Sequence, residues 1–386
     1  MKIFPTIHTI NDVLPHIRDY DEIVVMEKDG YTVIDYVHMD TKTFTGNPET
    51  DLGCRMRRAC RGLIFDADGK LISRPFHKFF NVGEREETLV ENIDWTRQHT
   101  VMHKLDGSMI RPIFLDGTFR LGTRKGITDV GNMAENFVVD NPEFGYRELC
   151  EHLNLAGLTP IFEFHSLDNI VVIDYEGSFM RLLAVRDNHT GFYAERDFLD
   201  ALCVEYNVPV VELFNVDLTE PNDFLSKVSK EKDSEGYVIR FDACQSTYKV
   251  KNDWYFQLHH VISGLNSERN IVRLLIDNEI DDILPKLPDN RRERIEDFAK
   301  GFWEVYNRFF NKVDKIWENV LKDVPEGSSR KDSAMRIIQE DKEIRPILFK
   351  FLDGVDDHHE VIKTMVRGKT NKDVVFSEFM KWFETQ

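Results

Sequence analysis

The pattern that most constrains the fold lies in the last third of the chain, where apolar residues recur at spacings of three and four. The residues of this stripe are Ile295, Phe298, Ala299, Phe302, Val305, Tyr306, Phe309, Val313, Ile316, Trp317, Val320 and Leu321. The spacing puts them on one face of a long α-helix, which must pack against other elements to leave water. Shorter helical patterns follow at 333–339, 346–352 and 374–383. We therefore expect a C-terminal domain built from helices.

Residues 1 to about 255 show a different pattern, of short β-rich segments separated by turn residues. The expected strands are 22–26, 31–36, 62–65, 109–115, 161–164, 170–173, 180–185 and 236–241, and the expected helices are 132–139 and 195–206. Asp116-Gly117 is typical of a tight hairpin, so antiparallel sheets are favoured over alternating strands and helices.

These two patterns predict an α+β protein of two domains, for which 386 residues suffice. Residues 1–258 should form antiparallel β-sheets with flanking helices, and residues 259–386 an all-α domain. The change of pattern places the boundary near residues 255–265.

The charge of the chain limits its partners. A net charge of −18 disfavours a protein that coats nucleic acid nonspecifically, because such proteins are basic. The basic residues are nevertheless clustered, first at Arg55, Arg57, Arg58, Arg61, Lys70, Arg74 and Lys78, and again at Arg120, Arg124 and Lys125. This distribution favours a local phosphate site on an acidic protein, while most other lysines are expected to be ordinary surface residues.

Cysteine usage and hydropathy indicate the compartment. The first residues contain no basic leader before a long apolar run, and no apolar window approaches the roughly eighteen residues of a membrane helix. The five cysteines are odd in number and lack a Cys-x-x-Cys pair, which favours reduced thiols over disulfides or zinc. We expect a cytoplasmic protein without a membrane segment.

Lys104 is the candidate nucleophile, in the segment Lys104-Leu-Asp-Gly-Ser108. A lysine amine attacks only when neutral, and its ordinary pKa is about 10.4, so burial or nearby cations must lower that pKa. Asp106 can orient the amine or a metal-bound water. Gly107 permits close approach of the backbone to a bulky ligand.

Further polar residues surround Lys104 along the sequence. Arg61 begins a strand, and Lys78 alternates with Phe80, so that a cation and a ring would point the same way in an extended segment. Glu163 lies between two aromatics in Phe162-Glu-Phe164, and Glu235 opens an apolar strand; such acids need a partner or a metal. The remaining candidates for phosphate contacts are Lys125, Lys249 and Lys251.

Each of these residues taken alone has an ordinary structural explanation. Glu163 could be a satisfied acid, Lys249 and Lys251 could protect a sheet edge, and Phe80 could belong to the core. These separate explanations do not account for the occurrence of all these residues together in this order.

That order resembles the motifs of the covalent nucleotidyltransferases, the ATP-dependent polynucleotide ligases and mRNA capping enzymes. The matching segments are Lys104-Leu-Asp-Gly-Ser, Phe162-Glu-Phe, Glu235-Gly-Tyr-Val and Tyr248-Lys-Val-Lys. Cys60-Arg-Gly-Leu-Ile-Phe, Arg74-Pro-Phe-His-Lys-Phe-Phe-Asn and Asp253-Trp-Tyr-Phe-Gln-Leu-His resemble more narrowly the phage-type RNA ligase 1 family. The resemblance covers residues 55 to 260, and it implies an adenylyltransferase domain followed by a helical domain concerned with RNA.

The resemblance implies ATP as cosubstrate and Mg²⁺, with Mn²⁺ as a substitute. Lys104 would carry AMP, Lys249 and Lys251 would hold the α-phosphate, and Arg61, Lys78 and Lys125 would serve the pyrophosphate or the RNA phosphate. Glu163 and Glu235 would hold the metal, and the pair Asp281 and Asp282 falls where the family has an acidic pair associated with a second metal. Nearby cations should also depress the pKa of Lys104.

The implied reaction seals single-stranded RNA with a 5′-phosphate and a 3′-OH, for example a nicked tRNA, through an adenylylated RNA end. A monomer in the cytoplasm of a host cell fits a phage-encoded enzyme of this kind. A DNA ligase, a capping-type guanylyltransferase and a non-enzymatic RNA-binding protein remain alternatives. The first two normally carry an OB-fold where this sequence predicts helices.

Overall fold

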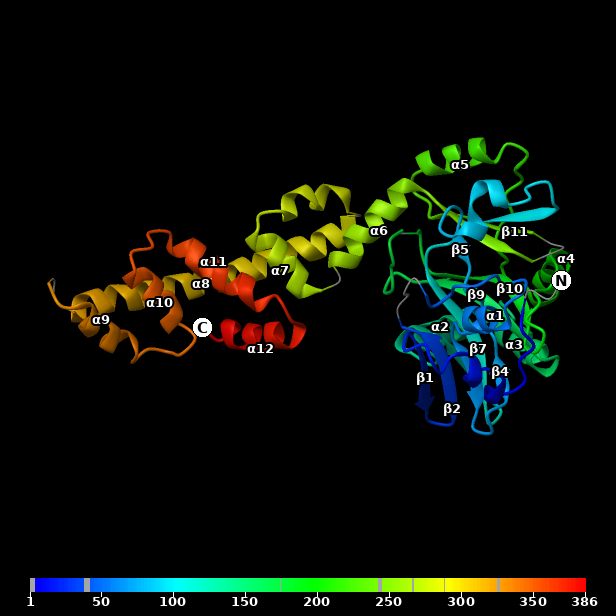
Figure 1. Cartoon of the computed structure of the whole chain (residues 1–386), viewed down its shortest axis with the longest axis horizontal. Helices are drawn as coiled ribbons and strands as arrows, with labels where there is room; N and C mark the ends of the chain where they lie inside the picture. The colour runs from blue at the N-terminus through cyan, green and yellow to red at the C-terminus, as the bar shows by residue number, and fades with distance from the viewer. Residues whose placement is uncertain are drawn as a thin grey trace. The chain divides into compact units, whose positions relative to one another are not determined.

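The computed structural model of the chain describes residues 4–37, 42–173, 175–241, 245–265, 267–287, 289–324 and 327–386 (Figure 1). It divides into two compact units, Met1–Gln257 and Leu258–Gln386. The first unit contains sheets with flanking helices and the second is helical throughout its described residues. The predicted α+β class is confirmed.

The described part of the first unit contains three four-stranded sheets. The first has the order β1 (Ile23–Lys28), β2 (Tyr31–Tyr36), β3 (Leu63–Asp66) and β4 (Leu71–Ser73). The second has the order β10 (Phe179–Asp187), β9 (Leu158–His165), β7 (Ser108–Leu115) and β8 (Thr118–Gly122). The third has the order β5 (Phe80–Asn81), β12 (Thr247–Lys251), β11 (Gly236–Phe241) and β6 (His99–His103).

Local sequence explains the antiparallel pairing of these strands. All neighbours are antiparallel except β12 and β5, which run parallel. Asp116 and Gly117 join β7 to β8 with φ of 49° and 75°. Two successive positive φ angles match the right-handed twist of a hairpin, and Asp-Gly adopts them at low cost. The hairpin predicted at this point is confirmed.

Helices cover the second sheet. The helices of the first unit are α1 (Leu52–Ala59), α2 (Asp129–Asp140), α3 (Tyr146–Leu155), α4 (Arg196–Tyr206) and α5 (Pro221–Lys230). Buried residues of α2, α3 and α4, among them Ala134, Leu149 and Leu202, form one core with Phe162, Phe164 and Leu182 of the sheet. The core therefore lies on one face of this sheet, and its opposite face is left for other contacts.

One predicted strand is wrong. Residues 170–173 form part of the loop between β9 and β10 rather than a strand. The backbone N–H groups of Val172 and Ile173 donate to the carboxylate of Asp106, each at 2.7 Å. A side chain takes the hydrogen bonds that a neighbouring strand would otherwise have accepted.

The second unit is built around the predicted long helix. Helix α6 (Asp253–Leu265) spans the boundary, and α7 (Glu268–Ile276), α8 (Asp289–Asp323), α9 (Arg330–Ile337), α10 (Arg345–Leu352), α11 (His358–Lys369) and α12 (Asp373–Glu384) follow. Phe302, Tyr306, Phe309, Val313 and Val320 of α8 are buried, which confirms the apolar face of that helix.

Short 3-10 helices complete the chain at Ile10–Asp12, Leu14–His16, Glu86–Thr88, Val90–Asn92, Ile280–Asp282 and Leu284–Lys286. Within the residues that the structure describes, every helix is too short or too polar to cross a membrane.

Candidate active site

A cavity of about 290 Å³ in the first unit brings together most of the residues that the sequence singled out. Its polar lining includes Arg61, Lys78, Lys104, Glu163, Lys249 and Lys251. Lys104 lies in the connection between β6 and β7, where the chain leaves the third sheet and enters the second. Glu163 comes from β9 of the second sheet, and the lysines at 249 and 251 come from β12 of the third. Residues from both sheets thus line one cavity.

Glu235 holds two lysines at the floor of this site. Its Oε1 atom lies 2.8 Å from Nζ of Lys104 and 2.8 Å from Nζ of Lys251. The Glu235 side chain is 4% exposed, whereas the two lysine side chains are 23% and 25% exposed. The carboxylate is therefore buried beneath two amines that reach the cavity.

The pKa of Lys104 differs from the sequence expectation. Burial lowers the pKa, but Glu235 and then Glu163 and Asp106 raise it by more, so the pKa is raised above its ordinary value. Nearby cations were expected to depress it. In the ligand-free protein the carboxylates prevail because Glu235 is in direct contact with the amine. The amine is consequently protonated at rest and would have to lose a proton to act as a nucleophile.

Asp106 anchors the loop that carries Lys104. Oδ1 accepts a hydrogen bond from the hydroxyl of Tyr255 at 2.7 Å, and Oδ2 accepts from the backbone of Val172 and Ile173. The backbone N–H of Asp106 donates to the hydroxyl of Tyr175 at 3.1 Å. Both carboxylate oxygens are occupied by these donors. Asp106 therefore positions Lys104 through the backbone rather than by direct contact.

Two glycines of the motifs are required by close packing. A Cβ atom on Gly107 would lie 2.6 Å from the carbonyl oxygen of Phe164. Gly236 has a φ of +129°, and a Cβ atom there would lie 2.0 Å from the carbonyl oxygen of Val250. Gly107 was expected to make room for a ligand, but the group that approaches it most closely is strand β9. These glycines hold Lys104 and Glu235 against their neighbouring strands.

Glu163 is the carboxylate that faces the cavity without a protein partner. Within the residues that the structure describes, its side chain makes no hydrogen bond or ion pair. Burial raises its pKa to about 8, with Glu235 and Asp106 adding to the increase and Lys104 opposing it. An acid in this position gains from a cation that enters the cavity.

Two lysines of the site have depressed pKa values. Burial first, and then Lys78, Lys104 and Lys251, lower the pKa of Lys249 to about 7. Burial also lowers the pKa of Lys78 to about 8. Cations crowded in this way are stabilised by an anion, so the cavity suits a phosphate chain.

Two residues predicted to bind the cofactor lie elsewhere. Phe80 is 2% exposed and lies beneath Lys78, whose Nζ is 4.9 Å from the centre of the Phe80 ring. Phe76 and Phe79 are among the aromatic residues that line the cavity instead. Lys125 is exposed in a tight turn and does not line the cavity. Phe80 is buried because other side chains cover its ring: the Phe44 ring lies 6.1 Å away, and Arg58 and Arg85 lie 5.1 and 4.9 Å from its centre.

Sequence reasoning missed several lining residues, among them Tyr36, Phe76, Tyr193 and Arg240. Tyr36 ends β2, and Arg124 lies 4.4 Å from its ring centre while pairing with Asp35 at 3.0 Å. The Arg240 that follows Glu235-Gly-Tyr-Val-Ile was a signal available in the sequence, because it alternates with Val238 on the strand.

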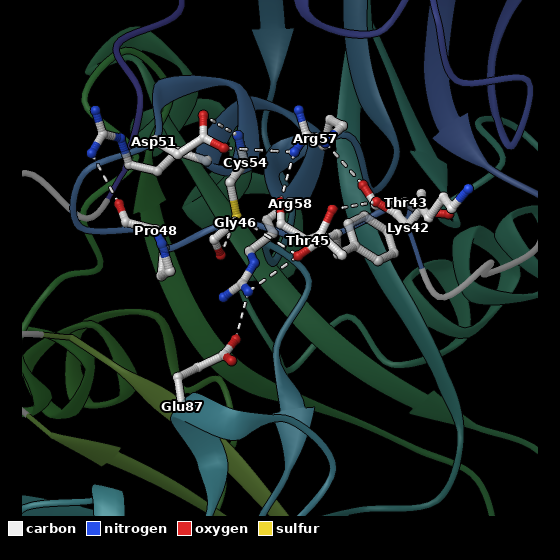
Figure 2. Close-up of polar contacts among 12 residues, drawn as sticks. Lys42, Thr43, Thr45, Gly46, Pro48, Asp51, Cys54, Arg57, Arg58 and Glu87 are labelled. Carbon is white, nitrogen blue, oxygen red and sulfur yellow. Dashed lines mark hydrogen bonds and ion pairs between the residues drawn. The ribbon is translucent and has the colours of Figure 1, made fainter.

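The arginines of α1 have a structural role, which accounts for part of the first basic cluster without a phosphate site. Arg57 donates to the carbonyl oxygens of Thr43 and Thr45 at 2.9 and 2.8 Å, and Arg55 donates to that of Pro48 at 2.9 Å (Figure 2). Arg58 donates to the carbonyl oxygen of Phe44 and pairs with Glu87 at 2.5 Å. These three cations hold the loop before α1 in place. Only Arg61 and Lys78 of that cluster line the cavity.

The acidic pair of the second unit is described in part. Asp281 is exposed in the 3-10 helix Ile280–Asp282, and the side chain of Asp282 lies outside the described residues. Among the described residues, no three His, Cys, Asp or Glu side chains form a group that could hold a metal by themselves. A metal at the cavity would therefore depend on one or two carboxylates together with phosphate oxygens and water.

Comparison with known proteins gives consistent matches. A family model described as RNA ligase matches residues 59–260. A putative RNA ligase of Thermovibrio ammonificans is 29% identical over 280 residues, which are 68% of this chain and 69% of that protein. The RNA ligase of Rhodothermus phage RM378 is 24% identical over 376 residues, which are 79% of this chain and 84% of the relative.

Solved structures resemble the chain over a shorter span. A Naegleria gruberi RNA ligase with PPi is 16% identical and covers 47% of this chain and 57% of its own, with a TM-score of 0.38. A variant of that enzyme with ATP and Mn covers 47% of this chain and 56% of its own, again with a TM-score of 0.38.

Proposed function

The chain belongs to the RNA ligase family, and on that premise we propose that it joins the 5′-phosphate and 3′-OH ends of single-stranded RNA through a lysyl-AMP intermediate. The observation that carries this proposal is the Lys104 amine in a cavity lined by a partner-free carboxylate, Glu163, and by the cations Lys249 and Lys251. A protein that only binds RNA has no need of a lysine held in this way.

In the first step the neutral amine of Lys104 attacks the α-phosphorus of ATP. An N–P bond forms, the bond to pyrophosphate breaks, and the amine gives up its proton. Lys249 and Lys251 stabilise the charge that develops on the α-phosphate, while Arg61 and Lys78 hold the leaving pyrophosphate. Lys125, which is exposed outside the cavity, is not assigned to this step.

The second step takes place at the same phosphorus as the first, and the third step takes place at the 5′-phosphorus of the RNA. An oxygen of the RNA 5′-phosphate attacks the AMP phosphorus, the N–P bond breaks, and Lys104 regains a proton as adenylylated RNA forms. The 3′-OH of the second end then attacks the RNA 5′-phosphorus, and AMP leaves. Each step requires positioned cations more than a further covalent group.

The donors at the cavity fit Mg²⁺, or Mn²⁺ in its place. Glu163 and Glu235 would hold the ion together with phosphate oxygens and water, because Mg²⁺ takes few protein ligands. When bound there, the metal supplies positive charge that offsets these carboxylates and so lowers the pKa of Lys104. We assign a second ion to Asp281 and Asp282 on the family resemblance alone.

The helical fold of the second unit favours an RNA ligase over a DNA ligase or a capping enzyme. Residues 258–386, as far as they are described, contain helices and no strand. An OB-fold, which a DNA ligase or a capping enzyme carries after the nucleotidyltransferase domain, needs five strands. We propose that this helical unit faces the RNA, with a nicked tRNA as one candidate substrate.

The cellular setting is also proposed. Four described cysteines, Cys54, Cys60, Cys150 and Cys203, are free thiols, while Cys244 lies outside the described residues. Free thiols suit a reducing compartment, and we propose that the chain acts as a monomer in the cytoplasm of a host cell.

Labelling tests the proposed function directly. The protein is incubated with Mg²⁺ and either α-³²P-ATP or α-³²P-GTP and then run on a denaturing gel. A covalent label from ATP alone supports the ligase assignment, and a label from GTP alone selects a capping-type enzyme. Sealing of a nicked DNA duplex as fast as single-stranded RNA contradicts the RNA assignment, because duplex geometry should block the cavity.

A further inference from the structure

Strand β10 carries an aromatic ring and a cation beside the proposed metal ligand. Arg181 is the direct partner of Glu163 in the antiparallel ladder, and Phe179 is the partner of His165. Directly opposed residues lie on the same face of a sheet. Arg181 and Phe179 therefore share the face of Glu163, opposite the helix-covered core. We call these two residues the β10 rim.

The ring of Phe179 is held in place by two aromatic neighbours. It stacks on the buried ring of His165, with centroids 5.4 Å apart and 23° between the planes. The ring of Tyr175 meets it edge-on at 5.1 Å. Phe179 itself is half-buried, so part of its ring reaches solvent. A ring held in one orientation loses little freedom when a base stacks on it.

Arg181 is held only loosely. Its Nη1 atom pairs with Oε1 of Glu212 at 3.0 Å, and the two side chains are 34% and 69% exposed. Exposed ion pairs contribute little to stability, so the guanidinium can exchange Glu212 for a phosphate at small cost. The guanidinium also lies 5.7 Å from the centre of the Phe179 ring. The β10 rim thus offers a cation and a ring together.

The rim adjoins the cavity, because Glu163, the ladder partner of Arg181, lines it. Leu183, which follows Arg181 by two residues at a β-bulge, lines the cavity, as does Glu163. Tyr175, which contacts Phe179, accepts a hydrogen bond from the backbone of Asp106 in the nucleophile loop. A molecule that attacks an adenylate on Lys104 must enter the cavity that Glu163 and Leu183 line.

Resting on the proposed function, we propose that the β10 rim binds the terminal nucleotide of the RNA strand that carries the 5′-phosphate. The terminal base stacks on Phe179, and Arg181 leaves Glu212 to contact the backbone phosphate that follows. Stacking on an aromatic ring accepts any base, and a neighbouring arginine selects for the nucleic-acid backbone. The rim is thus a contact to the second substrate, distinct from the contacts to ATP.

The full-length protein and six variants test this assignment. Phe179→Ala and Arg181→Ala remove the rim, and Phe179→Tyr and Arg181→Lys retain a ring and a cation. Arg120→Ala is the matched control, because Arg120 is also 34% exposed, also in an ion pair at 2.9 Å, and in the same sheet on β8. Glu212→Gln removes the partner of Arg181 and leaves the rim itself intact.

Two measurements separate the rim from the nucleotide site. The first is the binding of a fluorescent, 3′-blocked, 5′-phosphorylated RNA oligomer, which requires no chemistry. The second is transfer of AMP from preformed lysyl-AMP to that oligomer in a single turnover. We expect Phe179→Ala and Arg181→Ala each to weaken RNA binding about tenfold and to raise the apparent KM for RNA by a similar factor. The formation of lysyl-AMP from ATP should be unchanged. Arg120→Ala and Glu212→Gln should leave RNA binding within about twofold of the wild type or, for Glu212→Gln, tighter.

An oligomer whose 5′-terminal nucleotide lacks its base identifies the contact. The wild type should bind it as weakly as Phe179→Ala binds the intact oligomer, and Phe179→Ala should not discriminate between the two. Unchanged RNA binding in both alanine variants overturns the assignment, as does a defect confined to use of the 3′-OH strand. Failure of the wild type to form lysyl-AMP would contradict the proposed function instead, while RNA binding would still report on the rim.

Discussion

The two units of this protein differ in where they keep their charges. In Met1–Gln257, Arg74, Arg111 and Arg186 are fully buried and Glu235 is nearly so. In the described part of Leu258–Gln386, the buried residues are apolar or aromatic apart from Thr370. The ion pairs of the second unit are exposed or partly exposed: the side chains are 67% and 47% exposed in Arg330–Asp353, and 22% and 21% exposed in Arg336–Glu340.

The difference teaches what each unit requires. Buried charges are costly unless they are hydrogen-bonded. Arg74 is bonded to the carbonyl oxygens of Pro5, Asn188 and His189, and so ties together segments that are distant in the sequence. The first unit uses such bonds to hold its loops in place. The second unit needs only helices packed through apolar faces, which is the less demanding arrangement.

The sharpest test of this contrast is Lys104→Ala. Lys104 is proposed as the only attacking group, so the acid-labile AMP adduct should fall below detection while circular dichroism and thermal unfolding stay unchanged. Lys104→Arg keeps the charge beside Glu235 and removes the nucleophile, so it should behave in the same way. An adduct of normal yield in either variant would show that the attacking group lies elsewhere.

Removing the charge of Glu163 or of Glu235 should come next in size of effect. Glu163→Gln and Glu235→Gln should each reduce adduct formation by about a hundredfold or more, because each removes negative charge offered to the metal. Raised Mg²⁺ should restore Glu163→Gln in part. Glu135→Gln, on helix α2 in the pair with Arg120, is the control. A Glu163→Gln rate near that of the wild type would return Glu163 to a structural role.

Loss of an arginine should lower the free energy of unfolding more in the first unit than in the second. Arg74→Met removes a donor from three carbonyl oxygens, of which those of Pro5 and Asn188 are buried, and should lower the free energy of unfolding by about 3 kcal/mol. Arg330→Ala removes an exposed pair and should cost less than about 0.5 kcal/mol. Urea titration with a probe in each unit measures both. Similar losses in the two variants would contradict the contrast.

Removing the second unit should change ligation more than adenylylation. A chain ending at Leu265 keeps helix α6 and the hydroxyl of Tyr255 that holds Asp106. It should still form lysyl-AMP if it folds, and should ligate RNA about tenfold more slowly, since the helical unit is proposed to face the RNA. Ligation of every RNA at the rate of the full chain would show that the helices serve another purpose.

The smallest expected effect is a pH dependence of ATP binding. The pKa of Lys249 is about 7 and that of Lys78 about 8, so both amines lose charge in the ligand-free protein as pH rises through these values. Bound polyphosphate raises both pKa values, so binding takes up protons and weakens as pH rises above 7. Calorimetry at pH 7.5 in two buffers of different ionisation enthalpy should reveal uptake of a fraction of a proton. Proton release would reverse the sign and exclude this account.

Much of this molecule could be predicted from its sequence because the signals are local. The α8 helix follows from spacing alone, and the β7–β8 hairpin follows from Asp116-Gly117. The segments around Lys104, Glu163, Glu235 and Lys249 carry the family resemblance, and all but Glu235 line one cavity while Glu235 contacts Lys104. Such residues can be recognised from the sequence because each motif occupies a single strand or turn.

Only the tertiary structure decided which neighbours each residue has. Residues 170–173 have the composition of a strand, yet their backbone binds Asp106, about 66 residues away. Arg57 and Lys78 belong to one basic cluster in the sequence, yet the first binds loop carbonyls and the second faces the cavity. The pKa of Lys104 is raised because Glu235 happens to lie 2.8 Å from it across a strand pairing. Burial, pairing and charge balance depend on distances between segments far apart in the chain, and no local pattern contains those distances.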